Sequence, residues 1–195
     1  MKKRILAGAV IMASSVMLSV SGIAFADKDK DEGSYGYSKD GYGLFERTTT
    51  IPIVKNKLYA TECGSCHFAY QPGWLPARSW QKMMGGLDNH FGENAELDQK
   101  TSDQITRYLV AESADMKSNR KSRKILRSIR ENEAPLSISS LRYMLKKHDE
   151  IPQRLIKGNA KVGSRANCIA CHKGATKGYF NEHGVNIPGY GPWED

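Results

Sequence analysis

The sequence of 195 residues has no cysteine outside two short stretches, and it is poor in hydrophobic residues. All four cysteines fall inside those stretches, so no thiol is left over for other disulfide or metal chemistry. Hydrophobic residues make up only 39% of the chain, against 18 glycines. This composition predicts a thin core for a fold built from polypeptide alone.

The two cysteine-containing stretches, residues 63–67 and 168–172, both read C-x-x-C-H. This pattern attaches a c-type haem: two thiols bond to the vinyl groups, and the adjacent histidine ligates the iron. A four-cysteine zinc site, a redox C-x-x-C and two disulfides are the alternatives, but none needs a histidine after the second cysteine. A haem also supplies the apolar surface that the chain lacks. The sequence therefore predicts two covalently attached haem c groups, held by Cys63, Cys66, Cys168 and Cys171 and ligated by His67 and His172.

Residues 1–26 have the layout of a secretory signal peptide. Three basic residues at positions 2–4 precede an apolar run over residues 5–20, and Ala24-Phe25-Ala26 gives the A-x-A cleavage pattern. An uncleaved membrane anchor is the alternative, but the apolar run is short for a membrane span. Attachment of c-type haem takes place outside the cytoplasmic membrane. We therefore predict a periplasmic protein whose signal peptide is cleaved after Ala26.

The charge of the chain gives little reason to expect an anionic partner. The formal charge is +8, and removal of three of the 29 basic residues leaves 26 against 21 acidic residues, or +5. Two propionates on each haem would offset most of this charge. We therefore predict no nucleic-acid partner, and membrane contact only through the signal peptide or a partner. Residues 117–130 hold seven basic side chains and no acid, which predicts a basic helix that is either solvated or docks an acidic redox partner.

Composition divides the rest of the chain into an arm and three further segments. Residues 27–50 are charged and then rich in glycine and tyrosine, which predicts a flexible arm. We expect an N-terminal haem domain over residues 51–116, a basic linking helix over residues 117–134 and a C-terminal haem domain over residues 135–195. The expected fold class is mostly α: two small helical c-type haem-binding domains with extensive loops and little or no sheet.

Local patterns predict several of the helices. Residues 53–60 have helical apolar spacing and lead into the first haem motif, and residues 79–84 form another short helical stretch. Thr101 and Gln104 make a capping-box pattern, which predicts a helix from there to about Ala114.

The first haem iron needs a sixth ligand or an open site, and His90 is the predicted ligand. It lies 23 residues after His67, with glycines on both sides that would let its loop reach over the haem. Met83 and Met84 are the alternatives, although methionines in a short helix usually pack in the core.

For the second haem, the predicted distal ligand is His148. It shares a helix face with apolar residues at three preceding positions, in a helix that Pro152 would stop, and it lies 20 residues before Cys168. A polar imidazole on an apolar face needs a partner, and iron would be one. His183 is the alternative ligand.

Several stretches beyond the haem motifs give the chain a resemblance to a known family. They read CGSCHFAYQPG at residues 63–73, LPARSW at 75–80, LDNHFG at 87–92, KHDEIP at 147–152 and CIACHKGA at 168–175. With these stretches the chain resembles the bacterial dihaem cytochrome c family. The resemblance implies an exported, low-potential electron carrier with two bis-histidine haems in two small helical domains. It assigns His67 and His90 to the first haem, and His172 and His148 to the second.

The resemblance also implies redox partners: an oxygen-binding monohaem cytochrome, or a membrane cytochrome b that feeds electrons in. Electron transfer is therefore the predicted function, and no enzymatic activity is expected, because six-coordinate irons leave no position for a substrate. Arg78 and Trp80 would pack around the haems or bond their propionates. The alternatives are a dihaem peroxidase or small-molecule reductase, in which one haem opens a coordination site, and a haem-based sensor.

Overall fold

The computed structural model describes residues 51–193, which belong to the larger of two units of the chain, Tyr35–Asp195. Our predictions for residues 1–26 and 27–50 lie outside the described residues. The described part is mostly helical, as predicted, and no helix in it is long and apolar enough to cross a membrane. Its α-helices are α1 Lys57–Glu62, α2 Ala77–Met84, α3 Gln99–Ala111, α4 Arg120–Arg127, α5 Arg142–Lys147, α6 Gln153–Ile156 and α7 Cys168–Cys171.

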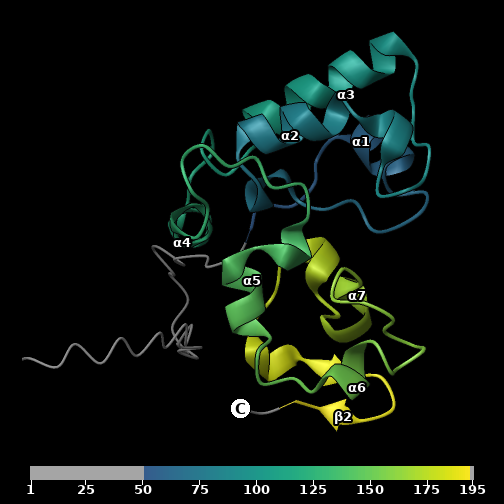
Figure 1. Cartoon of the computed structure of the whole chain (residues 1–195), viewed down its shortest axis with the longest axis vertical. Helices are drawn as coiled ribbons and strands as arrows, with labels where there is room; N and C mark the ends of the chain where they lie inside the picture. The colour runs from purple at the N-terminus through teal and green to yellow at the C-terminus, as the bar shows by residue number, and fades with distance from the viewer. Residues whose placement is uncertain (1–50, 194–195) are drawn as a thin grey trace, which may run out of the picture. The chain divides into compact units, whose positions relative to one another are not determined.

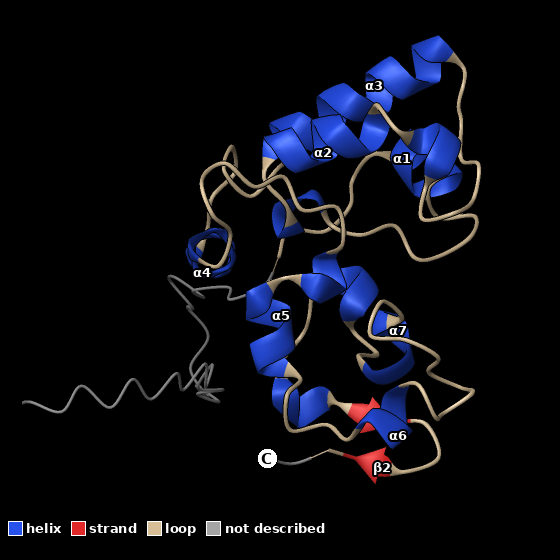
Figure 2. Ribbon diagram, viewed as in Figure 1, coloured by secondary structure: helices blue, strands red, loops and turns tan. Residues whose placement is uncertain are grey.

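Short 3-10 helices and one small β-ribbon complete the described fold (Figures 1 and 2). The ribbon pairs β1, Asn186–Ile187, with β2, Gly191–Pro192, in antiparallel register. Figure 1 shows α1, α2 and α3 gathered in one group and α5, α6 and α7 in another, with the ribbon beside α6. The 3-10 helices are η1 Pro72–Trp74, η2 Leu87–Asn89, η3 Ile138–Ser140, η4 Ala175–Lys177 and η5 Glu182–Gly184.

Side chains just before three helices accept bonds from amides in the first turn, which have no partner inside the helix. Asn56 accepts from Tyr59 N at 2.9 Å in α1, and Asn119 serves α4 in the same way. In α3 the cap is Asp98, which accepts from Thr101 N at 3.1 Å. Our prediction of a capping box at Thr101 was therefore wrong. Because Asp98 provides the cap, α3 begins two residues earlier, at Gln99, and it ends at Ala111.

Four other predicted helices have different bounds in the structure. Those expected over residues 53–60 and 79–84 are Lys57–Glu62 and Ala77–Met84. The basic helix covers Arg120–Arg127 rather than residues 117–130, because Asn119 caps its start and Ser128 ends it. The helix before His148 ends at Lys147, and His148 is its C-terminal cap. Pro152 does not stop that helix. It begins the next one, α6, since proline suits the start of a helix, where an N–H has no helical partner.

The larger hydrophobic core crosses the predicted domain boundaries. It joins residues from α2 and α3, such as Trp80 and Ile105, with Ile125 of α4 and Leu141 and Met144 at α5. A smaller cluster lies under the β-ribbon and comprises Ile156, Val162, Val185 and Ile187. The division at residues 116 and 134 thus stays a prediction, and the basic segment between them contributes to the main core.

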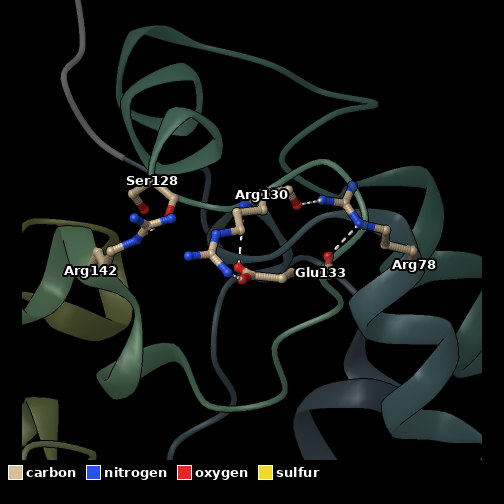
Figure 3. Close-up of polar contacts among 5 residues, drawn as sticks. All are labelled: Arg78, Ser128, Arg130, Glu133 and Arg142. Carbon is tan, nitrogen blue, oxygen red and sulfur yellow. Dashed lines mark hydrogen bonds and ion pairs between the residues drawn. The ribbon is translucent and has the colours of Figure 1, made fainter.

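Arginines hold the turn that follows α4 (Figure 3). Arg78 of α2 donates from Nε to the Glu133 carbonyl at 2.6 Å and from a terminal nitrogen to the Arg130 carbonyl at 3.2 Å. Arg142 of α5 donates to the Ser128 carbonyl at 3.1 Å. The ion pair between Arg130 and Glu133, at 3.4 Å, is exposed and adds little stability. Arg78, which we expected beside a haem, therefore bonds to backbone carbonyls that join α2 to this turn.

Candidate haem sites

The first pair of facing imidazoles consists of His67 and His90. Their ring centres are 6.2 Å apart, and their planes differ by 26°. His67 closes the haem motif that follows α1, and His90 follows η2. After His90 the chain turns sharply through Phe91 and Gly92, both with positive φ, of 58° and 100°. Two backbone hydrogen bonds between His90 and Glu93 close this turn. Glycine tolerates a positive φ, and Gly92 is one of the glycines expected to give the loop its freedom.

The second pair consists of His148 and His172. Their ring centres are also 6.2 Å apart, but their planes differ by 87°. The haem motif forms α7, and its His172 is held by a backbone bond to Cys168 and by a bridge to Val185. His183, the alternative ligand, lies exposed in η5. The ring that faces His172 across this separation is thus His148.

The common separation of 6.2 Å fits one metal ion between the rings of each pair. A metal–imidazole nitrogen bond is about 2.0 Å long. In a five-membered ring with bonds of about 1.33 Å, each atom lies about 1.1 Å from the centre. Two rings on opposite sides of one ion would then have centres about 6.3 Å apart. Met83 and Met84, the other candidates at the first site, pack in the hydrophobic core instead.

In His67 and His148, a hydrogen bond at Nδ1 leaves the other ring nitrogen, Nε2, available to bind a metal ion. Nδ1 of His67 lies 2.8 Å from the Phe68 carbonyl, and Nδ1 of His148 lies 2.7 Å from the Met144 carbonyl. A carbonyl can only accept, so each Nδ1 carries the proton and donates it. Nε2 then presents its lone pair, and the hydrogen bond fixes the orientation of the ring.

The pKa values of His90 and His172 also favour neutral rings, the form in which histidine binds a metal ion. Burial, followed by the positive charge of His67, lowers the pKa of His90. Burial, then His148 and then Lys121, lowers the pKa of His172 to about 4. Both rings therefore stay unprotonated near neutral pH, as metal ligation requires.

Burial raises the pKa of Cys63 and that of Cys168 to about 11, so both thiols are protonated near neutral pH. None of the four cysteines is in a disulfide. Within residues 51–193, no group of three or more His, Cys, Asp or Glu side chains could hold a metal ion. The arrangement suits thiols that react with haem vinyl groups, and it disfavours the zinc and disulfide alternatives.

Hydrogen bonds join the loop after the first motif to both flanks of the second motif. The Tyr70 hydroxyl donates to the Ala166 carbonyl at 2.5 Å, two residues before Cys168. The buried Gln71 donates from Nε2 to the Ala175 carbonyl at 2.6 Å and accepts from Trp74 Nε1 at 3.0 Å. These contacts span about a hundred residues along the chain, and sequence reasoning missed them.

Aromatic contacts continue this connection toward the second histidine pair. The Trp74 and Phe180 rings meet edge to face with centres 4.9 Å apart. Phe180 in turn lies 5.5 Å from the His172 ring. On the other side, the Tyr70 ring lies 5.1 Å from the His67 ring. The protein between the two sites is therefore continuous packed structure.

Comparison with known proteins identifies the family of this chain. The sequence profile of the dihaem cytochrome c family matches residues 59–180. The chain belongs to the dihaem cytochrome c family. This dihaem cytochrome c binds two haem c groups covalently, and it is an electron-transfer protein by family.

Two solved structures give the extent of the similarity. A dihaem cytochrome c from Shewanella baltica OS155 is 41% identical, with a TM-score of 0.61, over 73% of this chain and 100% of the other. A dihaem cytochrome c from Rhodobacter sphaeroides is 44% identical, with a TM-score of 0.59, over 66% of this chain and 99% of the other. No curated protein matched the chain in a sequence search.

Proposed function

We propose that this dihaem cytochrome c carries single electrons between redox proteins, with His67 and His90 on one iron and His172 and His148 on the other. The observation that carries the proposal is the separation of 6.2 Å in each pair. Bound haem supplies a one-electron ferric–ferrous couple. Two histidine ligands would complete the coordination of each iron and favour a lower reduction potential than a methionine–histidine set.

Two further observations support His148 over His183 as the second distal ligand. The family match ends at Phe180, so it includes His148 and leaves out His183. The Nδ1 bond from His148 to the Met144 carbonyl orients the ring, whereas His183 is exposed. Cys63 and Cys66 would hold the first haem, and Cys168 and Cys171 the second.

An enzyme or a sensor would need a coordination position that opens. The ring centre of each motif histidine lies 6.2 Å from that of a second histidine, which fits one iron bonded to both rings. This arrangement supports an electron carrier whose irons have no open coordination position. The proposal therefore includes the absence of peroxidase or reductase activity.

The proposed setting follows the predictions from the sequence. The protein works in the periplasm after cleavage behind Ala26, with a haem domain on each side of the basic segment 117–134. Its proposed acceptor is a monohaem oxygen-binding cytochrome, and its proposed donor is a membrane cytochrome b. The layout of residues 1–26 and the family resemblance support these assignments.

Carbon monoxide binding to the ferrous protein tests the ligand set. Wild type should bind none, because both irons are six-coordinate. His90→Ala and His148→Ala should each bind about one carbon monoxide per chain. His183→Ala is the matched control and should behave as wild type. Ready binding by wild type would contradict the carrier proposal, and binding by His183→Ala alone would move the second ligand to His183.

A further inference from the structure

The two histidine pairs have the same separation but different ring orientations. The planes of His67 and His90 are 26° apart, close to parallel, whereas those of His148 and His172 are 87° apart, nearly perpendicular. The two pairs therefore differ by 61° in the angle between their ring planes.

Contacts within the protein hold these orientations. His148 donates to the carbonyl of Met144 one turn back in α5, which aligns its ring with that helix. His172 packs against Phe180, with centres 5.5 Å apart and planes at 60°. In the first pair, His67 donates to the carbonyl of the next residue, Phe68. In each pair, one ring is thus oriented by a backbone acceptor, and the acceptor differs between the two pairs.

Ring orientation affects an iron held between two imidazoles. Each imidazole donates π density to the iron d orbital that lies perpendicular to its own plane. Parallel rings act on the same d orbital, so the electron hole of ferric iron is strongly stabilised there. Crossed rings act on two different orbitals, which stay close in energy, and the ferric state is stabilised less. Crossed rings therefore raise the reduction potential relative to parallel ones.

Burial acts in the same direction. His67 is exposed, whereas His172 is half-buried. Water stabilises the additional positive charge of ferric iron, and solvent exposure is one of the factors that set haem potentials. The less exposed second site should therefore have the higher reduction potential.

We infer that this cytochrome holds its haems in two unlike ligand fields, and that the crossed pair His148 and His172 creates the site of higher reduction potential. The inference rests on the proposed bis-histidine ligation. A one-electron donor that reduces the His67 site leaves its iron ferrous. Transfer onward returns that iron to ferric and converts the iron at His172 from ferric to ferrous, with no proton or atom moved. At equilibrium, the iron at His172 therefore holds the electron most of the time.

Low-temperature electron paramagnetic resonance during a reductive titration tests this order. The oxidised protein should give one rhombic low-spin signal from the parallel pair and one strongly anisotropic low-spin signal from the crossed pair. The anisotropic signal should disappear first. We expect the two singly reduced forms to differ in population by at least tenfold, which is ~59 mV for a one-electron couple.

One variant assigns the signals. His90→Ala should abolish the rhombic signal alone. Two rhombic signals, or earlier loss of the rhombic one, would overturn the inference, and wild type suffices for either result. High-spin signals in untreated wild type would instead contradict the proposed function.

Discussion

Gly178 lies where the second haem loop meets the start of the described chain, and replacing it with alanine should cost much stability. Gly178 is buried and has φ of +77°. A Cβ at this position would lie 2.2 Å from the carbonyl oxygen of Ile51, whose side chain is fully buried. The left-handed conformation costs a residue with a Cβ about 1–2 kcal/mol. Overpacking against a buried segment adds about 1–3 kcal/mol, so the total loss is about 2–5 kcal/mol.

Gly163 offers a matched control for this substitution. Its φ is +74°, almost the same, but nothing lies within 4 Å of the position that a Cβ would take. Gly163→Ala should therefore lose only the conformational part, about 1–2 kcal/mol. The difference between the variants isolates the contact with Ile51, which we place at about 1–3 kcal/mol.

Thermal unfolding of the haem-loaded protein, followed by far-ultraviolet circular dichroism, measures the difference. In a chain of this size, 1 kcal/mol changes Tm by about 2–4 °C. The Tm of Gly178→Ala should therefore lie about 2–12 °C below that of Gly163→Ala. Equal losses in the two variants would contradict this prediction, because they would mean that Ile51 does not pack against Gly178.

Two further predictions concern the link between the sites and a helix cap. Tyr70→Phe removes the bond to the Ala166 carbonyl and should lower the free energy of unfolding by about 1 kcal/mol in urea titrations. Tyr108→Phe removes the longer bond, of 3.2 Å, that the Tyr108 hydroxyl accepts from the Lys55 amide, and it should lose less; an equal loss would argue against the Tyr70 link. Hydrogen bonds from Thr101 lower the pKa of Asp98, so its contribution is present above the unfolded pKa and lost as pH falls through the folded value. Asp98→Asn should therefore lose less stability than wild type between about pH 5 and pH 3 in the same titrations, and a parallel loss would count against this cap.

Local chemistry made the haem motifs and their histidines predictable. Two thiols and a histidine must lie at fixed spacing to hold one haem, so Cys63, Cys66 and His67 could be identified from five consecutive residues. His90 and His148 each have their ring centre 6.2 Å from that of a motif histidine, and their role as iron ligands stays a prediction. The start of α3 was less predictable, since Asp98 and Thr101 are both good caps and only one of them can begin the helix.

The links between the two halves could not be predicted in this way. Tyr70 and Ala166 are 96 residues apart, and Gln71 and Ala175 are 104 residues apart. No local pattern records such a pairing, because it depends on how the halves pack. The ring angle of His148 likewise depends on where the Met144 carbonyl points after α5 has folded. The partners of Arg78 could not be predicted either, because they are backbone carbonyls, which every residue has.

In the proposed function, each haem iron lies between two histidine rings. Near-infrared magnetic circular dichroism of the oxidised protein tests it most directly, because the low-spin ferric charge-transfer band differs between bis-histidine and methionine–histidine ligation. Two bis-histidine irons should give a bis-histidine band with the intensity of two haems per chain. A methionine–iron band, or a high-spin signal from either haem, would contradict it.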